Sequence, residues 1–156
     1  MKNRSEARRG FTLIEILLVL AIIGMLAGVA IFAMVGQREG AKLDITKAMI
    51  HSVENALDTY NMNIGHYPTE EEGGMDALRV KPNFQNETLG EKWRGPYLKQ
   101  EARDPWGNKL NYQLTPPGTP EAQQTPYKLW SFGPNGTDEN GGGDDIKNWT
   151  DETTTK

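Results

Sequence analysis

The sequence concentrates candidate ligands for a cation near its carboxyl terminus. Residues 131–149 read SFGPNGTDENGGGDDIKNW, with five glycines from position 133 to position 143 and four acidic residues. Calcium binds six to eight oxygen atoms from carboxylates, amides and backbone carbonyls, and glycine-rich turns expose such carbonyls. The residue types alone are consistent with a calcium site and also with a solvated acidic loop without an ion. An EF-hand is not indicated, because it needs glycine at position six and glutamate at position twelve. Counted from Asn135, these positions hold Asn140 and Ile146.

Another carboxylate, Glu15, directly precedes an apolar segment. Residues 16–36 contain no charged residue, and as a helix they would span about 31 Å, close to the thickness of the hydrocarbon core of a membrane. We therefore expect a transmembrane helix. A carboxylate in such a helix costs roughly 2.5–3.5 kcal/mol at the centre of the bilayer and less near its surface. Glu15 is therefore expected either to reach water at the membrane surface or to have a cationic partner from outside the helix.

Charge is distributed unequally along the 156 residues. The whole chain carries a formal net charge of −4, whereas residues 1–10 hold four basic residues and one acid, so the remainder carries −7. Lys and Arg are enriched on the cytoplasmic side of membrane helices, which predicts a cytoplasmic amino terminus and an exported body. The acidic body argues against binding of nucleic acid. The absence of cysteine excludes disulfides and thiol chemistry.

The pattern after the apolar segment predicts an α+β fold. Apolar residues recur every three or four positions from 41 to 60, so the helix should continue as an amphipathic helix, pack its apolar stripe on a sheet and end at Gly65. The stripe consists of Ala41, Ile45, Met49, Val53, Leu57 and Tyr60. Thr69 and Glu72 form a capping-box pattern that predicts a short helix through residues 75–80. Residues 110–114 and 127–132 are predicted strands, and residues 82–96 and 115–126 are predicted loops. The expected fold is a long N-terminal helix packed against a small antiparallel β-sheet.

The residues around Glu15 resemble a known processing signal. The sequence Arg8-Arg9-Gly10-Phe11-Thr12-Leu13-Ile14-Glu15, followed by the apolar segment, resembles the type III signal of type IV pilins and pseudopilins. The resemblance implies that a prepilin peptidase removes the leader, residues 1–10, after Gly10 and methylates the new N-terminal residue, Phe11. It also implies that Glu15 faces the N-terminal amine of a neighbouring subunit. Residues 11–37 would form the transmembrane and filament-core helix, and residues 38–156 the periplasmic body.

Motifs in the body resemble those of the major pseudopilins of type II secretion systems. They are NIGHYPT at 63–69, GPYL at 95–98, DPWGN at 104–108, WSFGPNG at 130–136 and DDI at 144–146. The resemblance implies a major structural subunit of the periplasmic pseudopilus, which polymerises with itself and pushes folded exoproteins through the outer membrane. Its implied partners are the prepilin peptidase, the minor pseudopilins, the inner-membrane assembly platform and, before assembly, membrane lipid. The implied location is the bacterial inner membrane, with a single pass and a periplasmic body, and then the periplasmic pseudopilus.

The same resemblance implies a calcium ion (Ca2+) in the C-terminal loop. Carried over by position, its ligands would be the side chains of Asn135, Asp144 and Asp145 and the backbone oxygens of Phe132 and Gly142. The family usually has aspartate where this chain has Asn135. An amide oxygen still binds calcium, but one negative charge is missing, which predicts weaker binding unless Asp138 supplies that charge.

Two other classes of function share some of these features. A type IV pilin for adhesion or motility would have the same signal and helix, but the body motifs and the lack of cysteine favour the secretion pseudopilin. A membrane-tethered periplasmic enzyme would need acid–base residues. The two histidines, His51 and His66, are better explained by a surface or packing position and a loop hydrogen bond. The sequence contains no G-x-S-x-G, H-E-x-x-H or phosphate-loop motif, and we therefore expect no enzymatic activity.

Overall fold

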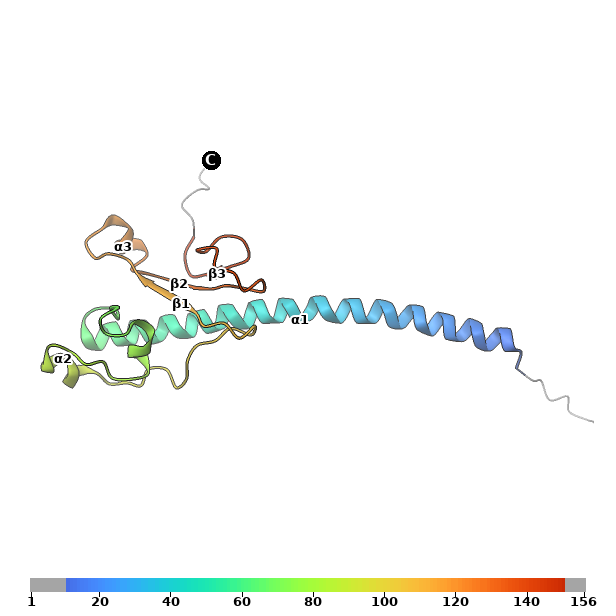
Figure 1. The fold of residues 1–156 in the computed structure, drawn as a ribbon, viewed down its shortest axis with the longest axis horizontal. Coiled ribbons are helices and arrows are strands. Elements are labelled where there is room, and N and C mark those ends of the chain that lie inside the picture. The colour runs from blue at the N-terminus through green and yellow to red at the C-terminus, as the bar shows by residue number, and fades with distance from the viewer. Residues whose placement is uncertain (1–10, 151–156) are drawn as a thin grey trace, which may run out of the picture. The chain divides into compact units, whose positions relative to one another are not determined.

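The computed structural model describes residues 11–150, with the side chains of residues 29–37 left out of the description. The chain divides into two compact units, residues 1–40 and 41–156. The helix α1 (Leu13–Ile64) contributes residues to both units (Figure 1). The second unit also contains the 3-10 helix η1 (Gly74–Leu78), the helices α2 (Glu87–Lys92) and α3 (Pro120–Gln124), and the strands β1 (Asn111–Leu114), β2 (Tyr127–Ser131) and β3 (Ile146–Lys147). The predicted combination of a long N-terminal helix and a small antiparallel sheet is confirmed.

The carboxyl end of α1 follows the prediction closely. Gly65 adopts a φ of 102°, and its N–H donates to the carbonyl of Asn61 at 2.7 Å. A left-handed residue directly after the last helical turn is a common helix stop, and glycine adopts this conformation without a steric penalty. The helix therefore ends at Ile64, where the sequence predicts its end.

The buried face of α1 differs from the predicted stripe in the first half of that stripe. Val53, Leu57 and Tyr60 are buried as expected and Met49 is half-buried, but Ala41 is exposed. Ile45 is 53% exposed, whereas its neighbour Thr46 is fully buried. The Thr46 hydroxyl donates to the carbonyl of Lys42 at 2.8 Å. Because the hydroxyl is satisfied within the helix itself, a threonine can occupy this buried position.

The three strands form one antiparallel sheet in the order β1-β2-β3. Tyr112 pairs with Leu129, and Trp130 pairs with Lys147. Strands β1 and β2 agree with the predicted strands to within one residue. The sheet shares one hydrophobic core with the second half of α1 and with η1, formed by Ile50, Val53, Ala56, Leu57, Tyr60, Ile64, Ala77, Leu78, Leu110, Tyr127, Leu129 and Ile146.

The segment after α1 has the predicted capping contacts, and the short helix that follows them is a 3-10 helix. The N–H of Thr69 donates to the Glu72 carboxylate at 3.1 Å, and the N–H of Glu72 donates to the Thr69 hydroxyl at 3.3 Å. Gly73 and Gly74 then adopt φ values of 91° and 56°. Left-handed residues interrupt a right-handed helix, so the chain turns and continues as the 3-10 helix η1. The predicted short helix through residues 75–80 is therefore present in part, as a 3-10 helix that ends at Leu78.

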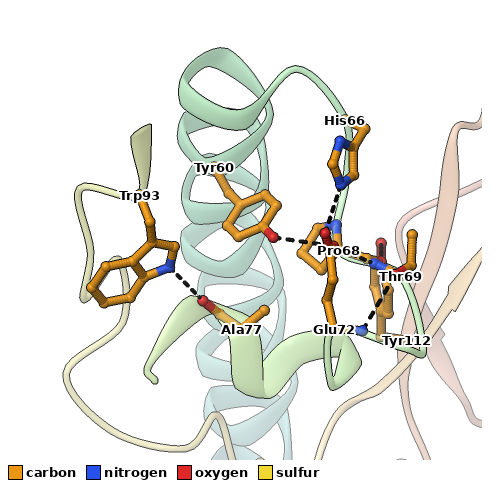
Figure 2. Close-up of polar contacts among 8 residues, drawn as sticks. All are labelled: Tyr60, His66, Pro68, Thr69, Glu72, Ala77, Trp93 and Tyr112. Atoms are coloured by element: carbon orange, nitrogen blue, oxygen red, sulfur yellow. Dashed lines mark hydrogen bonds and ion pairs between the residues drawn. The ribbon is translucent and has the colours of Figure 1, made fainter. Parts of the chain in front are cut away.

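Polar contacts connect this segment to the end of α1 and to Trp93 (Figure 2). The hydroxyl of the fully buried Tyr60 donates to Glu72 at 3.1 Å, and His66 Nε2 lies 2.8 Å from the other oxygen of that carboxylate. The indole N–H of Trp93 donates to the carbonyl of Ala77 at 3.0 Å. Burial, reinforced by the nearby Glu72 carboxylate, raises the pKa of Tyr60 well above its usual value.

Two predicted loops contain short helices. In residues 82–96, Asn86 caps α2 by accepting the N–H of Thr88 at 3.0 Å. In residues 115–126, Thr119 caps α3 by accepting the N–H of Ala122 at 3.2 Å, and Pro120 occupies the first helical position. Both caps use residue types that favour helix starts, but each helix is too short to produce a readable apolar period.

Candidate functional site

The residues of the predicted processing signal lie at the amino-terminal edge of the described chain. Gly10 lies outside the described residues. Phe11 is 80% exposed, and Glu15 lies in the first turn of α1, where its N–H donates to the carbonyl of Thr12 at 3.1 Å. A carboxylate in the first turn interacts favourably with the positive end of the helix dipole. The arrangement leaves both the Phe11 ring and the Glu15 carboxylate accessible to another molecule.

The first turns of α1 expose a continuous apolar surface. Every large apolar side chain described from Phe11 to Leu26 has between 49% and 80% of its surface exposed. At Gly24 and Gly28, a Cβ atom would meet no other atom within 4 Å. By the measure of length and apolar content, no helix in the described part of the chain could cross a membrane.

Two of the predicted calcium ligands are brought together. The N–H of Asn135 donates to Asp144 Oδ2 at 3.0 Å, and the Asn135 side-chain amide donates to Asp144 Oδ1. Gly133 has a φ of 63° and lies so close to the backbone of Asp144 that a Cβ atom would collide with the Asp144 carbonyl oxygen. The C-terminal loop, residues 131–149, therefore folds back on itself at this point.

The third predicted side-chain ligand, Asp145, has one engaged and one unengaged oxygen. Its Oδ2 accepts the N–H groups of Glu139 at 3.0 Å and Gly141 at 2.8 Å. Its Oδ1 is buried and has no hydrogen-bond partner. A buried carboxylate oxygen without a partner is energetically unfavourable, and a hard cation is a ligand that would satisfy it.

The predicted backbone ligands lie in the same loop. The carbonyl of Gly142 accepts the N–H of Asp145 at 2.9 Å and retains a second lone pair, and Phe132 directly follows β2. One oxygen of Asp138 is already engaged, because its Oδ1 accepts the indole N–H of Trp130 at 3.0 Å and the N–H of Asn140 at 2.9 Å. The donor set of amide, carbonyl and carboxylate oxygens has the chemistry that calcium prefers.

A metal centre built only from acidic or histidine side chains is not found among residues 11–150, since no three such groups converge there. The predicted ligand set contains two carboxylates, Asp144 and Asp145. Its remaining donors therefore have to be the Asn135 amide oxygen and backbone carbonyls, which suits calcium better than a transition metal.

The far half of the loop is covered by aromatic side chains. The Trp149 ring meets the Trp130 ring edge to face, with 5.8 Å between ring centroids. It covers Gly141, where a Cβ atom would collide with the indole. The Lys147 ammonium lies 5.2 Å from the centroid of the Trp149 ring, within range of a cation–π interaction. These contacts hold the carboxyl-terminal part of the loop against the sheet without a disulfide.

Two buried polar residues, Asp104 and Ser131, were not among the predicted site residues. The Ser131 hydroxyl donates to Asp104 Oδ2 at 2.7 Å. A signal was present, because Asp104 opens the DPWGN motif and Ser131 is the first residue of the C-terminal loop. Their contact was not predictable, since 27 residues separate them.

The two histidines occupy positions without a catalytic arrangement. His51 is exposed on α1 and pairs with Glu54 at 2.8 Å. His66 forms the contact with Glu72 described above, which agrees with its interpretation as a loop hydrogen bond.

Two family models match the chain in consecutive segments. The model described as type II secretion system (T2SS), protein G matches residues 33–149, and the prokaryotic N-terminal methylation motif matches residues 7–31. The predicted processing signal and the predicted body family are therefore found in the expected order.

Curated relatives and a solved structure agree with these matches. Type II secretion system core protein G of Escherichia coli (strain K12) is 39% identical over 145 residues, which is 93% of each chain. The protein of the same name from Aeromonas hydrophila is 39% identical over 149 residues, 96% of each chain. The crystal structure of the major pseudopilin from the type 2 secretion system of enterohaemorrhagic Escherichia coli has a TM-score of 0.55 at 33% sequence identity. The match covers 74% of this chain and 92% of that chain. The chain therefore belongs to the type II secretion system protein G family, a family of structural pseudopilin subunits rather than enzymes.

Proposed function

We propose that this protein is the major structural subunit of the periplasmic pseudopilus of a type II secretion system, which polymerises to push folded exoproteins through the outer membrane. The observation that carries this proposal is the exposed apolar surface of α1 within the segment that matches the methylation motif. Exposed apolar surface is unfavourable in water by about 25 cal/mol per Å². Identical helices packed side by side would cover it, and the open positions at Gly24 and Gly28 permit close approach of two helices.

Processing prepares the amino terminus for assembly. A prepilin peptidase hydrolyses the bond between Gly10 and Phe11 and methylates the amine of Phe11. The new terminus is an α-ammonium group, and it provides the cation that Glu15 requires in apolar surroundings. An ion pair between Glu15 of one subunit and the Phe11 amine of its neighbour would favour one register of packing, because both charges are satisfied only there.

Before assembly, the protein resides in the inner membrane. Support comes from the sequence, in which a basic leader precedes the 21 uncharged residues 16–36. The leader lies in the cytoplasm and the body in the periplasm. The protein then passes from lipid to the filament through the inner-membrane assembly platform, and minor pseudopilins join it there.

We further propose that the C-terminal loop binds calcium through Asn135, Asp144 and Asp145, with backbone oxygens from Phe132 and Gly142. The unpartnered, buried Asp145 Oδ1 and the close pair of Asn135 and Asp144 support this proposal. The Asn135 amide oxygen accepts the N–H of Thr137 at 2.6 Å, so binding of an ion by this oxygen would require the amide to turn and give up that hydrogen bond. A bound calcium ion would supply the positive charge that lets adjacent carboxylates lie together.

The filament function is tested by deletion of the gene in a bacterium that has both a type II secretion system and type IV pili. We expect secretion of exoproteins to stop, twitching motility to continue, and the wild-type gene to restore secretion. Loss of twitching with intact secretion would instead assign the protein to the pilus.

The calcium proposal is tested by thermal melting of the full chain in non-ionic detergent with EDTA, calcium or magnesium. Calcium at 100 times its dissociation constant should add about 2.7 kcal/mol of stability. A melting temperature that is the same in calcium and in EDTA would contradict the proposed site.

A further inference from the structure

The Asp104 carboxylate is a buried charge whose hydrogen bonds are well satisfied. Only 4% of the residue is exposed. Its Oδ1 accepts the N–H groups of Trp106 at 3.0 Å and Asn108 at 2.8 Å, which closes the turn formed by the DPWGN motif. Its Oδ2 accepts the hydroxyl of Ser131 at 2.7 Å. Oδ2 also accepts the side-chain amide of Asn108 at 3.4 Å. Four donor groups from two distant segments therefore hold one carboxylate in a fixed orientation.

Ser131 connects this carboxylate to the C-terminal loop. The residue is fully buried at the end of β2, and its Oγ donates to Asp104 while it accepts the N–H of Gly133 at 3.1 Å. Gly133 is the residue that lies against the backbone of Asp144. A path of hydrogen bonds and close contact thus runs from Asp104 through Ser131 and Gly133 to a proposed calcium ligand.

The turn also approaches the loop at another point. A Cβ atom at Gly136 would lie 3.8 Å from the side-chain nitrogen of Asn108, and Gly136 has a φ of 67°. The DPWGN turn therefore lies beside Gly136, which directly follows the proposed ligand Asn135, and it is linked to Gly133 through Ser131. The other half of the loop is held differently, through Asp145 and the tryptophan contacts.

We propose that Asp104, acting through Ser131, is a positioning residue for the C-terminal loop. It fixes residues 131–136 in the conformation in which Asn135 faces Asp144, before any ion is present, and it thereby sets the affinity of the site for calcium. The second statement rests on the calcium site proposed above, whereas the first concerns the loop alone. Residues that orient metal ligands from the next layer change metal affinity by about 10- to 100-fold when they are replaced.

The test compares two variants of the full chain, each of which lacks one buried hydroxyl group. Both are studied in non-ionic detergent. Ser131→Ala removes the connection to Asp104. Thr115→Val is the matched control, because the Thr115 hydroxyl is also buried and donates to the carbonyl of Thr125 at 2.7 Å, at the opposite end of the strand pair. Calcium binding is measured by isothermal titration calorimetry. We expect Ser131→Ala to raise the calcium dissociation constant about 10- to 100-fold and Thr115→Val to leave it unchanged.

Amide hydrogen exchange without calcium separates this inference from the calcium proposal. In Ser131→Ala we expect faster exchange at Gly133 and Asn135 and unchanged exchange at Gly141, whose N–H is held by Asp145. Unchanged exchange at Gly133 and Asn135 would overturn the positioning role, as would wild-type calcium affinity in the variant. If the wild-type chain binds no calcium, the proposed calcium site and the proposed effect of Asp104 on calcium affinity are both overturned. The exchange rates at Gly133 and Asn135 then still decide whether Asp104 and Ser131 position the loop. If Ser131→Ala does not fold, Ser131→Cys, a side chain of similar shape but a weak donor, carries the same expectations.

Discussion

Asn135 donates both its backbone N–H and its side-chain amide to the carboxylate of Asp144, nine residues further along the chain. The two contacts use both carboxylate oxygens, so the amide of Asn135 satisfies Asp144 in the absence of an ion. An aspartate at position 135 would instead place a second negative charge opposite Asp144. Aspartate at position 135 should therefore destabilise the ion-free loop and stabilise the calcium-bound loop, relative to asparagine.

We predict that Asn135→Asp destabilises the ion-free protein and tightens calcium binding. Loss of a hydrogen bond to a charged group costs about 1.5–3 kcal/mol, and the two carboxylates repel each other. An added negative charge at the ion should lower the dissociation constant at least tenfold, equivalent to about 1.4 kcal/mol. Thermal melting in EDTA and calorimetric titration with calcium measure the two effects.

The control for Asn135→Asp is Gln123→Glu, which makes the same charge change at an exposed position on α3. It should change neither the melting temperature in EDTA nor the calcium dissociation constant appreciably. If Asn135→Asp binds calcium no more tightly than the wild type, Asn135 is not a ligand.

Gly133→Ala should damage the loop more than an equivalent change at another left-handed glycine. Both Gly133 (φ 63°) and Gly118 (φ 86°) have backbone conformations that disfavour a side chain, which costs roughly 1–2 kcal/mol. At Gly118 the added methyl group would meet no atom within 4 Å, whereas at Gly133 it would collide with the carbonyl oxygen of Asp144.

The difference in unfolding free energy between Gly133→Ala and Gly118→Ala therefore isolates the collision. We expect it to exceed about 1 kcal/mol, measured by thermal melting in EDTA. Only the change at Gly133 should also weaken calcium binding. Equal losses of stability for the two variants would show that the loop shifts to accommodate the new methyl group and that the collision has no measurable cost.

Much of the fold could be predicted because its main elements have a clear period or a clear stop. The helical repeat through Val53, Leu57 and Tyr60 and the glycine at position 65 define the second half of α1, and alternation defines β1 and β2. The burial of Thr46 in place of Ile45 was not predictable, because it depends on a hydroxyl finding its acceptor within the helix.

The candidate site could be predicted only in part. Residue types identified the acidic, glycine-rich loop, and the approach of Asn135 to Asp144 followed from matching positions. The sequence contains no signal for which oxygen of Asp145 stays unpartnered, since that depends on the local turn at Glu139 and Gly141. Contacts between segments far apart in the chain, such as Ser131 with Asp104, require the folded structure.

Stability should fall steeply above pH 10, because buried tyrosines resist ionisation. Burial is the main cause that raises the pKa values of Tyr60, Tyr112 and Tyr127 above the ordinary value of about 10. The unfolded chain releases these protons near pH 10 and the folded chain does not, so unfolding releases protons in this range. The stabilisation is therefore complete below pH 10 and decreases as the pH rises further, by about 1.4 kcal/mol per pH unit for each tyrosine.

Thermal melting between pH 8 and pH 12, together with the ultraviolet absorbance of tyrosinate, measures this dependence. Tyr60→Phe should reduce the slope, since it removes one such group, and should also lose the hydrogen bond to Glu72. Reversible ionisation of all tyrosines near pH 10 in the folded protein would contradict the prediction.

Glu15→Gln should permit processing but prevent assembly. The variant retains the apolar segment and the basic leader, so membrane insertion, removal of residues 1–10 and methylation of Phe11 should proceed, as mass spectrometry of the membrane fraction would show. The amine of Phe11 then lacks its carboxylate partner, and an unpaired charge in apolar surroundings costs about 3–5 kcal/mol. Because every subunit in the filament carries this cost, electron microscopy should show few or no filaments. Asp44→Asn, which removes an exposed acid further along α1, should be processed equally well and still assemble. Normal filaments from Glu15→Gln would refute the proposed pairing of Glu15 with the neighbouring amine.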